Sequence, residues 1–353
     1  MAAPDPEKLD AFLGKLVNDL GASAGAALVL LGDRLGIYKA MADGAPVTPE
    51  ELADKTHLNP RYLREWLSAQ AAAGYVDYSP KSKKFKLNPE QCAAFADEGG
   101  PAFFAGAFEV AQAMWLDEPK VAEAFKSGKG VGWHEHSKCL FRGTERFFRP
   151  GYNAHLVSRW IPALRGVKEK LEQGAIVADV GCGHGASTIL MALAYPKSRF
   201  YGYDYHEAST DRARQLAKEA GVAKRITFET ASAKDYPALG YDLVAFFDCL
   251  HDMGDPVGAG AHVRESLAED GAWMIVEPFA HDELKDNLNP VGRVYYAAST
   301  MICTPVSLSQ EVGLGLGAQA GEARLKKVAK EAGFSKFRRA AETPFNLVFE
   351  ARV

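Results

Sequence analysis

The stretch Val177–Thr188, which reads VADVGCGHGAST, constrains the fold more than any other part of the chain. A strand-like segment leads into three glycines, Gly181, Gly183 and Gly185, and then into small residues that can begin a helix. Glycine lets backbone N–H groups approach a ligand closely, and a helix N-terminus favours negative charge. Because Ala186 completes the spacing of a dinucleotide-binding loop, the glycines by themselves leave dinucleotide, nucleotide and S-adenosyl ligands open.

The second half of the chain alternates two kinds of pattern. Apolar, strand-like segments begin at Ile176 and are separated by helical segments, among them residues 208–220 and 259–267. The strand-like segments read IVADV, RFYGYDY, ITFETA, YDLVAFFDCL and AWMIVEPF. Strands that alternate with helices predict a parallel sheet covered on both faces. After a helix over 322–332, two further strands turn at Thr343–Pro344 and can close the sheet as a hairpin.

The first forty residues predict helices. Apolar residues recur at helical spacing from Phe12 to Leu35. Gly21, Gly32 and Gly36 are the positions at which these helices can be interrupted or end.

Residues 45–90 predict a winged helix. Thr48 and Glu51 have the spacing of a capping box, and Asn59 begins a second helix in the same way. Two short strands, YVDYS and KFKLN, follow across a polar turn. Helix, turn, helix and hairpin is the order of elements in a winged-helix domain.

Two more helical stretches follow, over 102–125 and 131–165, and Pro150–Gly151 predicts a break in the second. The change of pattern along the chain indicates two domains. We expect a helical, winged-helix domain over 1–125 and a ligand-binding α/β domain over 126–353.

Composition is that of an ordinary soluble globular protein. The 353 residues are 47% hydrophobic and 24% charged, and the formal net charge of −4 disfavours a general binder of nucleic acid or anionic membranes. The five cysteines contain no C-x-x-C pair, as in reduced cytosolic proteins. The N-terminus lacks the features of a signal peptide, and the apolar run Ala22–Leu31 is too short to cross a bilayer. His134 and His136 have no third ligand at regular spacing. We therefore expect a cytoplasmic protein without a membrane segment or a metal site.

Two acidic residues discriminate among the ligands that the glycines leave open. Asp179 lies two residues before the first glycine, where a carboxylate repels a pyrophosphate but suits an ammonium and a sulfonium. Asp204, at the end of the next strand, can accept hydrogen bonds from two ribose hydroxyls, and Tyr205 can pack on adenine. A loop at Ser232–Lys234 could read the adenine edge. In this order the features favour an S-adenosyl ligand.

The motifs VADVGCGHG and YGYDYH and the end of the chain resemble class I S-adenosylmethionine-dependent methyltransferases. With the winged helix in front, the whole chain resembles the two-domain small-molecule O-methyltransferases of plants and bacteria. It is more closely similar to a bacterial subgroup described either as methyltransferases or as transcriptional regulators. The resemblance implies a seven-stranded, Rossmann-like sheet with a C-terminal hairpin, preceded by a helical winged-helix domain that forms a homodimer.

The resemblance also implies S-adenosyl-L-methionine as cofactor and a set of residues that bind it. Phe148 and Tyr152 lie on the helix that closes over the cofactor in relatives. Ser232 stands where the family often has an acid, and Phe247 where the plant enzymes often have a polar contact. The full set is Asp179, Gly181, Cys182, Gly183, Gly185, Asp204, Tyr205, Ser232, Ala233, Phe247, Asp248, Phe148 and Tyr152.

The segment FFDCLHDMGDP follows the fourth strand and carries the candidate chemistry. His251 matches the catalytic histidine of the O-methyltransferases, so the resemblance implies that it acts as general base, and Glu277 matches an acid that orients it. Asp252 is a further carboxylate at the site, or the cap of the helix that follows. The alternative is that His251 only packs in a loop.

A long segment over 287–322 separates the fifth strand from the last helix and is expected to line an acceptor pocket. Tyr295, Tyr296, Met301 and Gln319 are candidates for its wall, and Asn346 matches a position that can face substrate in the family. We expect the acceptor to be a small, hydroxylated molecule.

The winged helix bears on a second class of function. Residues 45–90 hold seven cations and six acids, whereas a DNA reader shows a basic footprint. The small-residue helix GASAGAALVLLG suits close helix packing in a homodimer. Three hypotheses follow: a methyltransferase, which we favour; a DNA-binding regulator that senses an S-adenosyl ligand; and an inactive scaffold.

Overall fold

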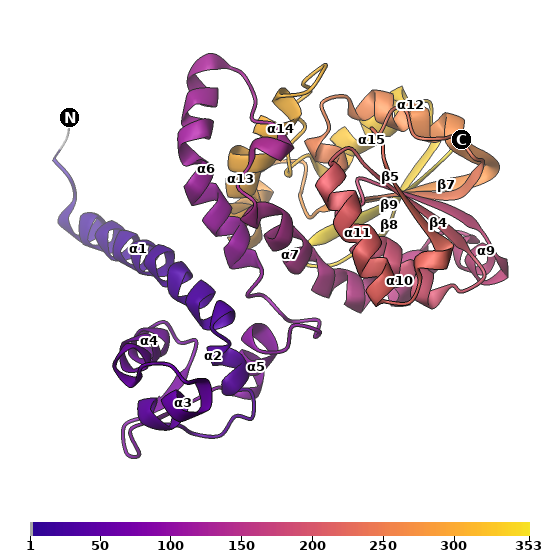
Figure 1. Cartoon of the computed structure of the whole chain (residues 1–353). Helices are drawn as coiled ribbons and strands as arrows, with labels where there is room; N and C mark the ends of the chain where they lie inside the picture. The colour runs from indigo at the N-terminus through magenta and orange to yellow at the C-terminus, as the bar shows by residue number, and fades with distance from the viewer. Residues whose placement is uncertain (1–2) are drawn as a thin grey trace. The chain divides into compact units, whose positions relative to one another are not determined.

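The structure is a computed structural model that describes residues 3–353. The chain forms two compact units (Figure 1). Unit 1 comprises the described residues up to Gln112 together with Arg142–Pro150, and unit 2 comprises Ala113–Phe141 and Gly151–Val353. The domain boundary that we placed between residues 125 and 126 stays a prediction.

Unit 1 contains the predicted winged helix. The Glu51 N–H donates to Thr48 Oγ1 over 3.2 Å in the capping box, and the Arg61 N–H donates to Asn59 Oδ1 over 2.9 Å at the start of the next helix. The two short strands pair antiparallel as the wing. In chain order the elements are α1 (Pro6–Arg34), α2 (Ile37–Ala40), α3 (Pro49–Thr56), α4 (Pro60–Ala72), β1 (Asp77–Ser79), β2 (Lys84–Lys86) and α5 (Pro89–Phe95).

Helix α1 runs without interruption through Gly21 and Gly32, so the breaks predicted there are wrong. A Cβ at Gly32 would lie 2.4 Å from the Trp66 ring and 2.5 Å from the Tyr38 ring, so this glycine allows the helix to approach the core closely. A glycine inside a helix costs about 1 kcal/mol relative to alanine, and burial of the two aromatic rings offsets that cost. Gly36, with φ +69°, separates α1 from α2.

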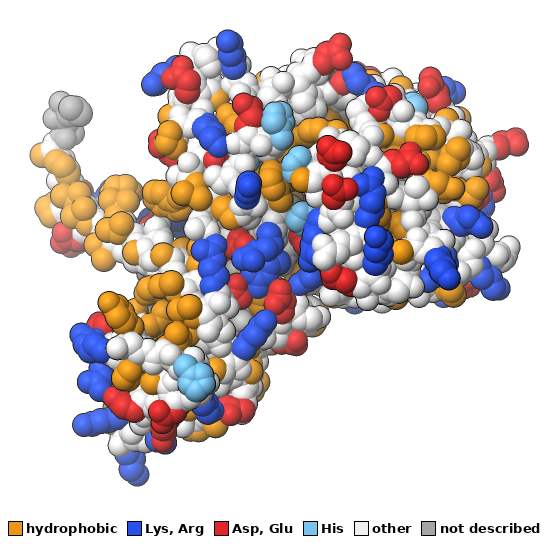
Figure 2. All heavy atoms as spheres, viewed as in Figure 1, with side chains coloured by type: hydrophobic (Ala, Val, Ile, Leu, Met, Phe, Trp, Pro, Cys, Tyr) orange, Lys and Arg blue, Asp and Glu red, His pale blue; other side chains and the backbone are white. Residues whose placement is uncertain are grey.

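The first half of α1 exposes apolar side chains. Phe12 is 57% exposed, and Val17 and Leu20 are each 71% exposed; Figure 2 shows apolar side chains gathered along this part of the helix. Within residues 3–353, α1 is the one helix that is long and apolar enough to cross a membrane, although the run Ala22–Leu31 alone is too short. The core helix of a soluble protein passes the same test, so length and composition alone are weak evidence for a membrane span. The expectations of a homodimer and of no membrane segment therefore both stay predictions.

Unit 2 is built on a seven-stranded sheet in the order β5-β4-β3-β6-β7-β9-β8. The strands are β3 (Ile176–Val180), β4 (Arg199–Asp204), β5 (Ile226–Thr230), β6 (Tyr241–Phe247), β7 (Leu267–Pro278), β8 (Lys336–Glu342) and β9 (Asn346–Arg352). Strands β3 to β7 run parallel, and β9 runs antiparallel to both β7 and β8. The predicted α/β sheet with a C-terminal hairpin is confirmed.

Helices connect and cover these strands. Helices α10 and α11 pack against β4 and β5, and α12 packs against β7 and α15. Figure 1 shows these helices around the fan of strands. The remaining helical elements are α6 (Ala107–Ser127), η1 (Trp133–Glu135), α7 (Cys139–His155), η2 (Leu156–Trp160), α8 (Ile161–Ala163), α9 (Val167–Gln173), α10 (Ala186–Ala194), α11 (Glu207–Glu219), η3 (Ala223–Arg225), η4 (Leu250–Asp252), α12 (Pro256–Ser266), η5 (Leu284–Asn287), α13 (Pro290–Ala298), η6 (Ser299–Cys303), α14 (Thr304–Leu308) and α15 (Gly321–Glu331).

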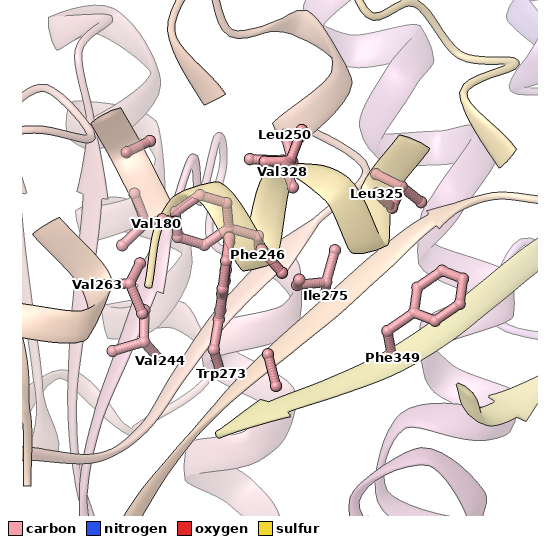
Figure 3. Close-up of a cluster of buried hydrophobic side chains, with 14 of the residues drawn as sticks. Val180, Val244, Phe246, Leu250, Val263, Trp273, Ile275, Leu325, Val328 and Phe349 are labelled. Carbon is pink, nitrogen blue, oxygen red and sulfur yellow. The ribbon is translucent and has the colours of Figure 1, made fainter. Parts of the chain in front are cut away.

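The core of unit 2 holds the two central strands in place. Phe246 on β6 and Trp273 on β7 are fully buried, and their ring centroids lie 5.3 Å apart in an edge-to-face arrangement. Val263 on α12 and Val328 on α15 belong to the same cluster (Figure 3). Burial of each such side chain contributes about 1.5–3 kcal/mol. This packing fixes β6 and β7, whose carboxyl ends carry polar residues.

Helix α7 continues through Pro150 and Gly151, so the break predicted there is wrong. The irregularity lies one turn later, in the π-helical element η2. Proline removes one helical hydrogen bond, but Tyr152 and Leu156 are buried on the turns that follow. Their packing holds the helix together where local propensity predicts an end.

Candidate active site

The glycine-rich turn after β3 combines two crowded positions with one open position. All three glycines have positive φ, +74° at Gly181, +52° at Gly183 and +78° at Gly185. A Cβ added at Gly181 would lie 2.7 Å from Cys249 Sγ, and one added at Gly185 would lie 2.6 Å from the Phe228 ring. A Cβ added at Gly183 would have no described atom within 4 Å, apart from those of the neighbouring residues in the chain. Packing therefore requires two of the glycines, and the third has open space beside its Cα in which a ligand fits.

Asp179 and Asp204 lie on either side of this turn. Asp179, fully buried on β3, accepts hydrogen bonds at Oδ2 from the Ser187 and Thr188 hydroxyls, each over 2.6 Å. Its Oδ1 has no hydrogen-bond partner among residues 3–353, and burial raises the pKa of this carboxyl to about 6. Asp204 accepts the Gly183 N–H at Oδ2, over 2.9 Å. An unpartnered buried carboxylate oxygen beside an open glycine turn fits the ammonium of an S-adenosyl ligand, because buried polar groups otherwise pair.

The candidate base and its partner come from neighbouring strands. His251 lies in η4 just after β6, and its Nδ1 is 2.6 Å from Glu277 Oε2 at the end of β7. Both side chains are buried, and Glu277 Oε1 accepts the Leu250 N–H over 3.0 Å. We assign the Nδ1 proton to the bond with Glu277, which leaves the lone pair on Nε2 free to accept a proton. Burial lowers the pKa of His251, but the charges of Glu277 and Asp252 outweigh it and hold that pKa well above its usual range.

Asp252 does not cap the following helix, as one of our two interpretations had it. The cap of α12 is Asp255, whose Oδ1 accepts the Gly258 N–H over 2.7 Å. Asp252 instead lies in η4, with Oδ1 3.2 Å from His251 Nε2.

Comparison with known proteins follows the division of the chain. The family described as "Methyltransferase domain" matches residues 171–333, and the family described as "Rv2258c-like winged HTH domain" matches residues 23–96. The chain carries an S-adenosylmethionine-dependent methyltransferase domain. The resemblance noted from the sequence is confirmed, as are the winged helix and the cofactor that the methyltransferase domain uses.

Curated relatives match this domain in part. The chain is 28% identical over 132 residues to dimethylglycine N-methyltransferase of Parasynechococcus marenigrum, which covers 37% of this chain and 47% of the relative. It is also 28% identical over 171 residues to 27-O-demethylrifamycin SV methyltransferase of Amycolatopsis mediterranei, covering 46% of this chain and 55% of the relative. The chain thus spans about half the length of the curated relatives it matches.

Solved structures share the fold over nearly the full length. Human N-acetylserotonin methyltransferase, in complex with S-adenosylmethionine, has a TM-score of 0.73 at 14% identity and covers 100% of this chain and 99% of its own. An O-methyltransferase family protein from Burkholderia thailandensis has a TM-score of 0.68 at 16% identity, with 99% of both chains covered. At such identities the likeness establishes the fold.

The other predicted cofactor residues of the methyltransferase domain occupy varied positions. The Cys182 side chain is buried towards Gly202 on β4, and its N–H and C=O are both engaged by backbone groups. Tyr205 is 47% exposed just after β4, as a surface for adenine requires. The Ser232 N–H donates to Asp235 Oδ1 over 2.8 Å, so this amide is already engaged. Ala233, beside it, is half-buried.

Two predicted aromatic contacts differ in where they lie. Phe247 is buried at the end of β6, with its ring centroid 5.4 Å from that of Tyr152. Phe148 belongs to unit 1, where it packs against Phe147 at 4.8 Å. Its closure over the cofactor stays a prediction.

The structure joins three predicted site residues into one hydrogen-bonded cluster. Asp248 accepts the Tyr152 hydroxyl at Oδ2 and the Asn346 amide at Oδ1, each over 2.8 Å. Asp248 also has φ +51°, a conformation that is uncommon for a residue with a side chain. We had placed Tyr152 and Asp248 against the cofactor and Asn346 against substrate, and the sequence contained no signal that the three contact one another.

Sequence reasoning missed Cys303, which lies beside the candidate base. It is buried at the end of η6, and the potential ligand atoms of His251, Asp252 and Cys303 all lie within 4.8 Å of one another.

The residues predicted to line the acceptor pocket differ in burial. Tyr295 is buried and donates its hydroxyl to Phe345 O over 2.8 Å, and Gln319 is buried too. Tyr296 and Met301 are half-buried.

Replacing Gly183 by valine is expected to prevent cofactor binding without unfolding the domain. The site has room for a side chain, and the positive φ adds about 1–2 kcal/mol of strain, but the new side chain occupies the space through which a ligand reaches the backbone. The matched variant Gly185→Val should unfold, since its Cβ meets the Phe228 ring. Thermal denaturation separates the two, and calorimetry with S-adenosylhomocysteine measures binding. Wild-type affinity in Gly183→Val would show that the ligand lies elsewhere.

Proposed function

We propose that this chain transfers the methyl group of S-adenosylmethionine to a hydroxyl group of a small acceptor, with His251 as general base. The observation that carries the proposal is the buried His251–Glu277 pair, joined over 2.6 Å. Methyl transfer is an in-line displacement in which positioning supplies much of the rate, and a hydroxyl acceptor must also lose its proton. A histidine held through Nδ1 presents Nε2, which lies 3.2 Å from Asp252 Oδ1, as the nitrogen that takes that proton.

The topology supports placing this pair next to the cofactor. β3 and β6 are neighbours in the sheet, and ligands of α/β sheets bind at the carboxyl ends of such strands. The two strand ends also touch, because the Cys249 thiol donates to Val180 O over 3.2 Å and would meet a Cβ at Gly181. His251 follows two residues after Cys249, which supports assigning the base and the glycine turn to one site.

The experiment is a methyl-transfer assay with labelled S-adenosylmethionine and a panel of phenols, aliphatic alcohols, carboxylic acids and amines. We expect label on hydroxyl groups, identified by mass spectrometry of the product. Transfer to amines alone would contradict O-methylation, but the assignment of a methyltransferase domain would still hold.

Ion pairing in the winged helix supports the enzyme over the DNA-binding regulator. Arg64 pairs with Glu50 over 2.7 Å, and Lys84 with Glu51 over 2.8 Å, so cations of the helices and wing are partly neutralised. A variant that lacks the wing lysines should have the same affinity for DNA as the wild type, and that affinity should depend on salt in the same way. A clear loss of retention would support the regulator instead.

We also propose that the chain is a homodimer whose interface includes the exposed apolar face of α1. Changing Val17 and Leu20 to glutamate should then raise the dimer dissociation constant by roughly 100-fold or more, since each buried apolar side chain contributes about 1.5 kcal/mol or more. Light scattering after size exclusion measures the mass. The control Lys8→Glu, on the same helix, should remain dimeric. A wild-type monomer that binds lipid vesicles through α1 would contradict the proposal.

A further inference from the structure

We propose that His251, Asp252 and Cys303 form a binding site for a divalent transition metal of the zinc type, and that the bound metal inhibits the enzyme. The three side chains come from η4 and η6, and their potential ligand atoms lie within 4.8 Å of one another. Ligand atoms around a tetrahedral zinc ion lie about 3.3–3.7 Å apart, given bonds of about 2.0–2.3 Å. His251 Nε2 and Asp252 Oδ1 are already 3.2 Å apart, so moderate side-chain movement closes the site.

The donor set indicates which ions fit. An imidazole, a thiolate and a carboxylate form a borderline-soft set that suits zinc and cobalt, whereas magnesium and calcium take oxygen ligands. Three protein ligands with a fourth position open is also the pattern of reactive zinc sites, in contrast to the four-ligand structural ones.

The arrangement of lone pairs gives an independent reason to expect a cation here. The His251 Nδ1 proton is engaged by Glu277, so in the neutral imidazole the Nε2 lone pair faces Asp252 Oδ1 across 3.2 Å. That oxygen is buried and has no hydrogen-bond partner in the described chain. Two acceptors that face each other repel unless a proton or a metal ion lies between them. A metal ion would satisfy both, and Glu277 would then be the carboxylate that orients a metal-bound histidine.

The backbone around Cys303 presents its thiol to the histidine. Cys303 is the last residue of η6, a π-helical turn between α13 and α14, and such turns are frequent at functional sites. The thiol binds metal as the thiolate, so its proton leaves to solvent when the ion enters. His251 and Cys303 are buried and Asp252 is half-buried, which favours the paired, metal-bound state of these charges over separate ones.

Inhibition follows because the metal and the acceptor proton compete for the same lone pair on His251 Nε2. This step rests on the proposed function, whereas metal binding itself does not.

Cobalt titration of the full-length protein tests the site. We expect one Co²⁺ per chain with a thiolate-to-cobalt charge-transfer band in the near ultraviolet, which Zn²⁺ bleaches by displacement. Cys303→Ser should lose the band, and the control Cys92→Ser, in unit 1, should keep it. Glu277→Gln should weaken Co²⁺ binding by about 10–100-fold, as loss of an outer-shell partner does. Circular dichroism verifies that each variant is folded. Absence of the band in the wild type, or its persistence in Cys303→Ser, would overturn the proposal.

Parallel methyl-transfer assays separate this proposal from the proposed function. Zn²⁺ should inhibit the wild type over the concentration range in which it displaces Co²⁺, and a chelator should restore full activity. Activity without Co²⁺ binding would overturn only the metal site. Co²⁺ binding without transfer to any hydroxyl acceptor would leave the metal site and overturn the proposed function. Activity that requires added Zn²⁺ would overturn inhibition.

Discussion

Substituting His251 by alanine is expected to lower kcat by about 10²–10⁴-fold, the usual contribution of a general base. Binding of S-adenosylhomocysteine should change little, because the ammonium and ribose partners that we assign, Asp179 and Asp204, lie on β3 and β4. Rapid-quench assays measure kcat, and calorimetry measures binding. Full turnover in His251→Ala would show that positioning alone suffices and that no base is used.

The pH dependence tests the same role with a finer variant. A base whose pKa is raised stays protonated up to a higher pH, so kcat/KM of the wild type should rise with pH through the neutral range and level off only in the alkaline range. Glu277→Gln removes one of the charges that raise the pKa of His251, so the rising limb should move to lower pH. The amide also offers a proton to Nδ1, which places the imidazole proton on Nε2, so kcat should fall as well.

A variant with lower kcat but an unchanged pH limb would show that Glu277 acts through packing and not through its charge. Asp54→Asn, an exposed change in the winged helix, serves as the matched control and should alter neither quantity.

Asp179→Asn is expected to weaken cofactor binding and to stabilise the free protein. Loss of a charge-assisted hydrogen bond to the ligand ammonium costs about 1.5–3 kcal/mol, or roughly 10–100-fold in Kd. The free protein gains because its buried carboxyl has a pKa of about 6 instead of 3.8. That difference costs up to roughly 3 kcal/mol at pH 7, and the amide can still accept hydrogen bonds from Ser187 and Thr188.

The predicted gain in stability of Asp179→Asn can be checked by its dependence on pH. A group whose pKa is higher in the folded state stabilises the fold at low pH and loses that contribution as pH rises through about 6. The melting temperature of Asp179→Asn should therefore exceed that of the wild type at pH 7 and approach it near pH 4. Calorimetry with S-adenosylhomocysteine gives Kd. Unchanged affinity would place the ammonium away from Asp179.

Local patterns predicted the elements that local forces determine. The glycine spacing after β3 and the apolar strands identified the sheet, whereas the His251–Glu277 pair was implied by the resemblance to the O-methyltransferases. The breaks expected at Gly32 and Pro150 were wrong, because tertiary packing outweighed helix propensity: Gly32 lies against two aromatic rings, and buried side chains follow Pro150. Propensity is a weak prior under such packing.

Contacts between distant segments could not be predicted. Cys303 lies far along the chain from His251 and reaches it through a π-helical turn that no residue pattern signals. For the same reason the sequence pointed to none of the ligands of the metal site that we propose, because we looked for ligands at regular spacing. The bonds from Tyr152 and Asn346 to Asp248 likewise join three distant segments.

The pairing of β6 with β7 has a consequence for how this chain can tolerate insertions and deletions. The register is regular from Leu243 to Phe247, beside the strand ends that carry His251 and Glu277, and its one irregularity lies between Tyr241 and Leu243, at the opposite end. An added residue at that irregularity can be absorbed as a bulge. Deletion of one residue between Leu243 and Phe247 would make the side chains of the rest of β6 face the opposite side of the sheet, and His251 would move with them. Length variation among descendants of this sequence should therefore accumulate at the amino end of β6.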